Sequence, residues 1–108
     1  MTTYFVSWEV DNAVLRAMSV SESREKTLET MKRVQSQLKS GEMVDWRVFA
    51  TGGRGYATIE CGELELYRRI TQWSLTVPWL RVTGAEPIIS VEQATEAFAS
   101  LTVAQTSK

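Results

Sequence analysis

Residues 52–61 (GGRGYATIEC) bring together three glycines, an arginine, a carboxylate and the chain's only cysteine, a set of residues that could do chemistry. Glycine-rich loops cradle phosphate groups because their backbone amides approach the anion closely. Known phosphate-binding loops, however, space their glycines more widely before Gly-Lys-Ser/Thr, or place the glycine turn at the start of a helix. GGRG fits neither pattern, so we predict that Gly52 and Gly53 form a tight turn between two strands, where glycine tolerates a positive φ.

Glu60 and Glu9 are the candidate general bases of the sequence. Glu60 falls in the middle of a predicted strand, where partial burial would raise its pKa toward the range of a general acid or base. Arg47 or Tyr56 would then polarise a substrate carbonyl. The alternative for Glu60 is an ion pair with Arg47 at a protein interface.

Cys61 would act as a nucleophile only if a base or a positive charge lowered the pKa of its thiol. Its side chain is predicted to face an apolar core, so we expect a buried and inert thiol. The chain contains no histidine, which excludes histidine-based acid–base catalysis and the commonest zinc and iron sites. We therefore expect no metal and no cofactor.

Composition and charge indicate one soluble domain. The 108 residues include 12 basic and 13 acidic ones, mixed along the chain, and 44% of the residues are apolar. Without a basic stripe, the chain is not expected to bind nucleic acid or an anionic membrane surface. The single cysteine and the lack of a signal-peptide pattern favour the cytoplasm. We expect one domain over residues 1–101 and a frayed tail over residues 102–108.

Hydrophobic periodicity and capping signals define the elements that would position these residues. Ser19 and Glu22 form a capping box that opens a helix, and Gly41 closes it. Strands are predicted over 3–10, 43–51, 54–61 and 79–85, with further helices over 63–74 and from Ser90 onward. The order β-α-β-β-α-β plus a C-terminal helix is that of a ferredoxin-like α+β fold, with a four-stranded antiparallel sheet and helices on one face.

Apolar residues at helical spacing indicate which side of each helix is buried. The predicted buried positions are Leu28, Met31, Val34 or Gln35 and Leu38 in the first helix, Leu66, Ile70 and Trp73 in the second, and Val91, Ala94, Phe98 and Leu101 in the last. The segment 11–18 carries Val14, Leu15 and Met18, so it is expected to form a flap or helical turn packed on the body.

A two-residue turn at Gly52 and Gly53 would place Thr51 opposite Arg54 and set the register of the hairpin. The face covered by the helices would then carry Val44, Trp46, Val48, Ala57, Ile59 and Cys61. The opposite face would carry Asp45, Arg47, Phe49, Tyr56, Thr58 and Glu60, with Phe5, Ser7 and Glu9 of the first strand. Aromatic side chains interleaved with opposite charges suit packing against another sheet. We predict a homodimer through this face, a dimeric α/β barrel, and the alternative is a monomer that leaves the face open.

Aromatic residues are numerous on the helix side of the predicted sheet, namely Trp8, Trp46, Trp73, Trp79, Tyr4 and Tyr67. They either fill the core or line a cavity that accepts a small apolar or aromatic molecule. The segment 11–18, with Met18, would be the lid of such a cavity. The candidate ligand-binding residues are therefore Trp8, Trp46, Trp73, Cys61 and Met18.

The stretches RGYATIE (54–60) and ELYRRITQWS (65–74), with a last strand ending at Pro87, resemble a family of small bacterial proteins in the dimeric α/β barrel, ferredoxin-like superfamily. In element order the similarity extends over residues 4–98. The superfamily includes muconolactone isomerases, antibiotic-biosynthesis monooxygenases that use no cofactor, chlorite dismutase-like haem proteins and stress-responsive barrel proteins. The resemblance implies a fold, a dimer and a pocket between sheet and helices, but no particular reaction.

The chain also departs from the enzymes of that superfamily. Without histidine it offers no proximal haem ligand and no histidine proton shuttle. Phe49 and Ala50 stand where the nearer family often ends the strand with a polar residue or histidine. These differences weaken any transfer of catalytic roles.

Two functions are consistent with these observations. The first is a homodimer that binds a small apolar or aromatic molecule between sheet and helices, in a pocket walled by Trp, Leu and Val. The alternative is a cofactor-independent isomerase or monooxygenase, in which Glu60 or Glu9 opens onto a pocket as the base and Arg47 or Tyr56 polarises a carbonyl. A third class, a structural or regulatory partner of another protein, would show an exposed apolar patch outside the dimer seam.

Overall fold

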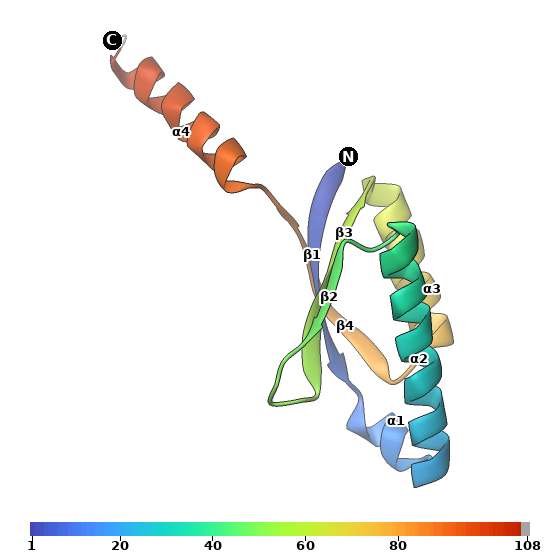
Figure 1. Ribbon diagram of the computed structural model, residues 1–108. Coiled ribbons are helices and arrows are strands. Elements are labelled where there is room, and N and C mark those ends of the chain that lie inside the picture. Colours follow the sequence, from blue (N-terminus) through green and yellow to red (C-terminus); the bar gives the residue numbers. More distant parts are fainter. Residues whose placement is uncertain (107–108) are drawn as a thin grey trace.

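The computed structural model describes residues 1–106, and the side chains of residues 1–101. The elements are β1 (Thr2–Val10), α1 (Asn12–Arg16), α2 (Val20–Ser40), β2 (Asp45–Val48), β3 (Arg54–Cys61), α3 (Glu63–Thr76), β4 (Leu80–Ile88) and α4 (Val91–Thr106). The chain is an α+β protein whose antiparallel sheet has the strand order β2-β3-β1-β4. α2 and α3 cover one face of this sheet and leave the other face open (Figure 1).

α2 and α4 begin at the predicted capping residues, and α2 ends at the predicted Gly41. Ser19 Oγ accepts a hydrogen bond from the Glu22 amide at 3.1 Å, and Gly41 ends α2 with a φ of 84°. At the start of α4, the Ser90 amide donates to Gln93 Oε1 at 2.9 Å and the Gln93 amide donates to Ser90 Oγ at 3.1 Å. This reciprocal pair is a complete capping box.

Three elements differ from their predictions by more than two residues at one end. β2 is shorter than 43–51 because Met43 is buried in the core before the strand and Phe49 already belongs to the loop after it. β4 is longer than 79–85 because β1 pairs with it as far as Ile88 opposite Thr3. α4 extends to Thr106 and so includes the first part of the expected tail over 102–108, while residues 107–108 lie outside the described residues.

The register of the β2–β3 hairpin is shifted from the prediction. Val48 pairs with Gly55 and Arg47 with Tyr56, so the connection is longer than the two-residue turn at Gly52 and Gly53. The Phe49 amide donates to the Arg54 carbonyl at 2.9 Å, and residues 49–53 form the loop between the two strands. Both loop glycines do have positive φ, 82° and 77°, as predicted. Because the shift is by two residues, the predicted division of side chains between the two faces is retained.

The buried side of the sheet follows the predicted alternation on the central strands. Tyr4 and Val6 of β1 and Ala57, Ile59 and Cys61 of β3 are buried and form one core with Val34 and Leu66 of the helices, and Trp8 of β1 is buried as well. Val44 and Val48 were predicted to join this core, but both are exposed. β2 is an edge strand, and the helices leave both of its ends uncovered.

The buried side of α2 also differs from the prediction. Thr30 and Val34 are buried, whereas Leu28 and Leu38 are exposed. Thr30 tolerates burial because its hydroxyl donates to the Lys26 carbonyl at 2.9 Å. The prediction is confirmed for Val34 and wrong for Leu28 and Leu38, because the helix is rotated so that Thr30 faces the sheet.

The last helix is not packed on the body of its own chain. The predicted buried positions Val91, Phe98 and Leu101 are exposed. α4 continues outward from the end of β4 on the open side of the sheet, and the chain extends over 67 × 27 × 21 Å (Figure 1). Periodicity showed correctly that these residues share one side of a helix, but it does not say which surface that side meets.

Candidate functional site

A partly enclosed apolar cavity of about 50 Å³ lies between the sheet and the helices. All four strands and α3 contribute to its wall, which includes Trp8, Trp46, Ala57, Ile59, Ile70 and Trp73. Three of the five candidate ligand-binding residues, Trp8, Trp46 and Trp73, are therefore brought together around one space. The aromatic side chains fill most of the core and still leave this gap.

The indole rings of Trp8 and Trp46 form one wall of the cavity. Their ring centroids are 4.9 Å apart and their planes are inclined by 12°. The two residues belong to β1 and β2, with β3 between them, and Gly55 of β3 lies opposite Trp8. A Cβ atom at position 55 would clash with Trp8 Cζ2 and with the Arg47 carbonyl oxygen. Glycine is required there because the indole approaches the backbone closely.

The indole nitrogen of Trp8 is a buried polar atom without a partner. The residue is 7% exposed, and no acceptor among the described residues receives a hydrogen bond from Nε1. Buried polar groups in native proteins are nearly always hydrogen-bonded, and an unsatisfied donor costs about 1–3 kcal/mol. An acceptor atom from a water molecule or a ligand would remove this cost.

A polar cleft of about 220 Å³ adjoins the apolar cavity between the C-terminal part of α2 and α3. The two spaces share the wall residues Met43, Ile59, Arg69 and Trp73. Gln37 and Gln72 add side-chain amides to the cleft. The site therefore has an apolar inner part and a polar outer part.

Glu65 organises the charges of this cleft. Arg68 Nε donates to Glu65 Oε2 at 2.8 Å, and Arg69 Nε donates to Glu65 Oε1 at 3.0 Å. Hydrogen bonds from Arg68 and then Arg69 lower the pKa of Glu65 from 4.5 to about 2. Arg69 Nη1 also donates to the Glu42 carbonyl at 2.7 Å, which holds the guanidinium at the boundary between the cavity and the cleft.

Trp73 is positioned from the other side by α2. The guanidinium carbon of Arg33 lies 4.7 Å from the centroid of the Trp73 ring, and Arg33 Nη1 donates to Thr76 Oγ1 at 2.7 Å. A cation over an indole face is an attractive contact. It links α2 to α3 over the polar cleft and limits the movement of the Trp73 ring.

A second recess, of about 260 Å³, lies on the α1 side of the Trp8–Trp46 pair. Leu15 of α1 and Trp79 contribute to its wall. The segment 11–18 thus forms the predicted helical turn, and Asp11 caps it by accepting hydrogen bonds from the amides of Ala13 and Val14. Met18 is half-buried and contributes to the wall of neither this recess nor the two spaces above.

Cys61 is buried beside the site without lining the cavity. Burial raises the pKa of its thiol above the ordinary value, with a smaller opposing effect from Arg69. A raised pKa leaves the thiol protonated and poorly nucleophilic. The position agrees with the prediction of an inert core residue.

The open face of the sheet carries a row of aromatic side chains. Phe5 and Tyr56 stack with centroids 4.9 Å apart, Phe49 lies 6.3 Å from Tyr56, and the Arg54 guanidinium lies 5.4 Å from the Phe49 centroid. These residues come from β1, β3 and the loop after β2. They form an amphipathic surface on the side opposite the helices.

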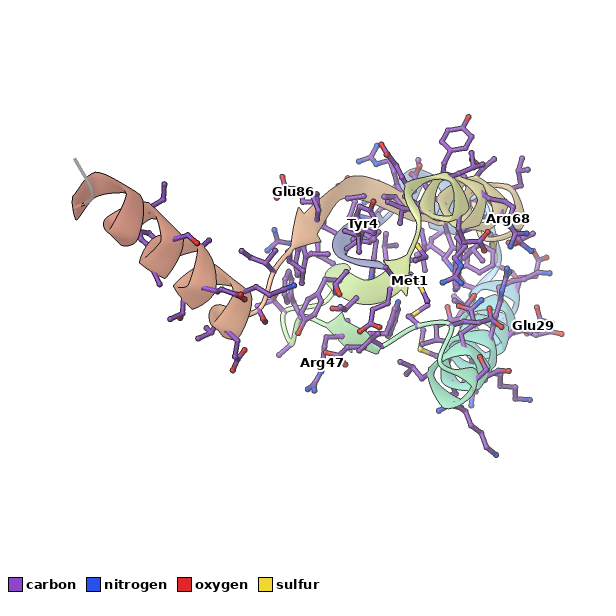
Figure 2. The ribbon with its side chains drawn as sticks, turned by 90° about the horizontal axis from the view of Figure 1, so that it is seen from above. Met1, Tyr4, Glu29, Arg47, Arg68 and Glu86 are labelled. Atoms are coloured by element: carbon purple, nitrogen blue, oxygen red, sulfur yellow. The ribbon has the colours of Figure 1, made fainter. Side chains whose placement is uncertain are left out.

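The candidate catalytic groups also lie on the open face, away from the cavity. Glu9 forms an ion pair with Arg81 of β4, and Glu60 is exposed opposite Thr3. The Arg47–Glu60 ion pair is not present: Arg47 Nε instead lies 3.2 Å from Asp45 Oδ1. Figure 2 shows Arg47 on the side of the sheet away from α2 and α3. Neither Glu9 nor Glu60 contributes to the cavity or the polar cleft.

Sequence reasoning missed Arg69, Met43 and Gly55 as parts of the site. Arg69 follows Leu66 by three residues and precedes Trp73 by four, so helical spacing already places it on the buried side of α3. Gly55 carried no such signal, because its role depends on the indole ring from another strand.

The described residues include no cluster of cysteine, aspartate and glutamate side chains that could hold a metal ion. Within the same part of the chain, no helix is long and apolar enough to cross a membrane. Comparison of the chain with models of protein families, with curated proteins and with solved structures gives no match.

Proposed function

We propose that the protein is a homodimer of ferredoxin-like protomers that binds a small apolar or aromatic molecule between its sheet and its helices. The observation that carries the binding function is the indole of Trp8, which lines an apolar cavity while its buried N–H has no acceptor among the described residues. Counted from the other edge, the strand order is β4-β1-β3-β2, and this order supports the ferredoxin-like assignment.

The dimensions of the site restrict the ligand. A cavity of about 150 Å³ takes up benzene, so the space of about 50 Å³ next to Trp8 is too small for a complete aromatic ring. The ligand must therefore extend into the polar cleft of about 220 Å³ or separate the stacked indoles. A molecule with an apolar body and a hydrogen-bond acceptor fits, because the lining residue Trp8 has an N–H without an acceptor and Arg69 lines both spaces.

The open face of the sheet supports the homodimer. Its aromatic row, Phe5, Tyr56 and Phe49, is flanked by the ion pairs Glu9–Arg81 and Asp45–Arg47. Stacking two such faces about a two-fold axis buries the aromatic rings and leaves the charged groups at the rim, which is the usual anatomy of an interface.

The position of the carboxylates favours binding over catalysis. A general base must lie within hydrogen-bond reach of the substrate. Glu60 and Glu9 are on the open face, and the cavity is on the helix side of the sheet. Arg81 also holds Glu9 in an ion pair. The isomerase or monooxygenase mechanism would therefore need a second site on the open face.

The binding function is tested with ¹⁵N-labelled protein and 3-phenylpropionate as the probe, because this molecule joins an aromatic ring to a carboxylate acceptor. The indole N–H signals of the four tryptophans are resolved reporters. We expect the signals of Trp8, Trp46 and Trp73 to shift, with the Trp8 signal moving as its N–H gains an acceptor. Trp79 does not line the cavity, so its signal should shift least. The Trp8→Phe variant lacks this indole, so the N–H signal that is missing from its spectrum is that of Trp8.

Native mass spectrometry of the protein as purified is the second measurement. An additional mass that is lost on denaturation would be a bound molecule from the expression host. Unchanged indole signals with 3-phenylpropionate and with its uncharged analogue 3-phenylpropanol, together with a native mass equal to that of the bare chain, would overturn the proposal. Shifts of Trp8, Trp46 and Trp79 without a shift of Trp73 would instead place the binding site at the recess next to α1, because those three indoles line it and Trp73 does not.

A further inference from the structure

α4 is a helix that leaves the body of its own chain. It follows Ile88, the last residue of β4, after a short connection, and it lies on the side of the sheet opposite α2 and α3 (Figure 1). Val91, Phe98 and Leu101, which recur at helical spacing, are 77%, 71% and 60% exposed. The connecting residue Ile89 is exposed as well.

Such a helix is poorly stabilised by its own sequence. Helices of this length are marginal in water unless an apolar side packs on another surface. α4 contains Glu92 and Glu96 but no lysine or arginine, so no ion pair between its own side chains supports it. A capping box at Ser90 and Gln93 defines its start but does not cover its apolar side. The helix therefore requires a surface on which to pack.

α3 has an apolar stripe on its outer side that nothing in the described part of the chain covers. Leu64, Tyr67 and Leu75 are 83%, 72% and 79% exposed, and Thr71 lies between the last two at helical spacing. Together with Arg68 they line a shallow recess. The opposite side of α3, with Leu66, Ile70 and Trp73, packs on the sheet. This outer stripe is an exposed apolar patch outside the open face of the sheet.

The two stripes match each other in length and in apolar character. At about 1.5 Å per residue, the stripe from Leu64 to Leu75 and the stripe from Val91 to Leu101 are both about 15–17 Å long. Arg68, which borders the α3 stripe, is already held by Glu65 in an ion pair, so the match rests on the apolar side chains.

The α3 stripe within the same chain is not where α4 lies. Figure 2 shows Arg68 and α3 at the opposite side of the molecule from α4, with the sheet between them. A helix that extends outward from the open face is directed toward whatever molecule packs on that face. In a two-fold dimer, each protomer would then extend its α4 toward the outer surface of the other.

We propose that α4 is an exchanged arm, which packs its Val91–Leu101 side on the Leu64–Leu75 stripe of α3 in a second copy of the chain. Two-fold symmetry makes the contact twice, so each protomer gives one helix and receives one. The arm explains two exposed apolar stripes with one contact. It does not depend on the ligand-binding function, and it adds a second interface to the sheet-to-sheet contact.

Disulfide trapping between two different chains tests the arm. A tagged chain with Thr71→Cys is mixed with an untagged chain that carries Ala94→Cys or Phe98→Cys, and the mixture is oxidised. We expect a tagged–untagged covalent dimer with at least one of the two partners, depending on the direction of α4 along α3. Ser36→Cys, exposed on α2 and therefore on another helix than the stripe, is the matched control and should not cross-link. The native thiol Cys61 is buried and stays reduced.

Two cysteines in one chain show whether α4 packs on the α3 of its own chain or on that of a second copy. The two pairs are Thr71→Cys with Ala94→Cys and Thr71→Cys with Phe98→Cys. A disulfide within one chain would overturn the exchanged arm, because it would mean that α4 folds back on its own α3. Failure of Thr71→Cys to link to either α4 position, in a mixture that still contains dimers by light scattering, would also overturn it.

Charge insertion gives an independent measurement. Leu75→Asp should raise the dimer dissociation constant at least tenfold, whereas Ser36→Asp on α2 and Ser100→Asp on α4 should leave it within about twofold. Equal effects of Leu75→Asp and Ser36→Asp would contradict the proposed contact. A sheet-to-sheet dimer without the arm would be insensitive to all three changes.

Discussion

Ala57→Val is the sharpest test of the apolar cavity. Ala57 is buried in β3, opposite Val6 and Trp46 on the neighbouring strands, and its methyl group lines the cavity. Valine is well suited to a strand, so the backbone should accept it. Empty apolar space costs about 24 cal/mol per Å³, which for a cavity of about 50 Å³ corresponds to about 1 kcal/mol. Filling this space should therefore increase the free energy of unfolding by up to about 1 kcal/mol.

The assay is urea denaturation, with thermal unfolding as a second readout. A gain of about 1 kcal/mol should raise the melting temperature by roughly 4–8 °C in a domain of this size. The same variant should lose the indole shifts caused by 3-phenylpropionate, because valine occupies the inner end of the site. Ala85→Val is the matched control: Ala85 packs on the same core from β4 but does not line the cavity.

A loss of stability in Ala57→Val would refute this reasoning. Methyl groups forced into a filled core destabilise a protein by about 1–3 kcal/mol. Such a result, with Ala85→Val unchanged, would mean that the Trp8 and Trp46 rings occupy the space in solution. The ligand-binding proposal would then lose its cavity.

Two further changes probe the contacts around the site, and a third probes the open face of the sheet. Gly55→Ala should destabilise the fold by about 1–3 kcal/mol in urea, because its Cβ would clash with Trp8, whereas Gly62→Ala, which has open space around it, should cost little. Glu65→Gln should weaken the fall in the free energy of unfolding between pH 4.5 and pH 2. A carboxyl whose pKa is lowered from 4.5 to about 2 in the folded state adds stability above pH 4.5, and this stability is lost as the pH falls toward 2. An equally steep fall in the variant would contradict this role. Tyr56→Asp should convert the dimer to a species of 12.2 kDa in light scattering, and an unchanged dimer would place the interface elsewhere.

Much of the architecture follows from local sequence rules. The capping residues Ser19, Gly41 and Ser90 define helix ends because a side chain or a left-handed glycine satisfies backbone groups within a few residues. The alternation in β1 and β3 places Val6, Trp8 and their neighbours on the helix side, since successive side chains in a strand point to opposite faces. Both rules use only neighbours in sequence.

The candidate site was predicted in part. Trp8, Trp46 and Trp73 were identified because large aromatic residues on the buried side of a small domain are hard to pack without gaps. Met18 was not part of the cavity wall, and Glu60 lacked its partner Arg47, because each assignment depended on a distance between elements. The Arg47–Glu60 pair in particular required the register of a two-residue turn, and the loop is longer.

Sequence by itself determined the elements of this protein and the residues that share a side of each, since hydrogen-bonding groups and side-chain periodicity act over a few residues. Tertiary structure alone decided the rotation of α2, the need for glycine at position 55 and the outward direction of α4. Those features depend on which surfaces meet across tens of residues, and hydrophobic periodicity carries no information about the partner of an apolar side. The last helix shows the consequence: the spacing of Val91, Phe98 and Leu101 predicts one buried side, yet all three residues are exposed.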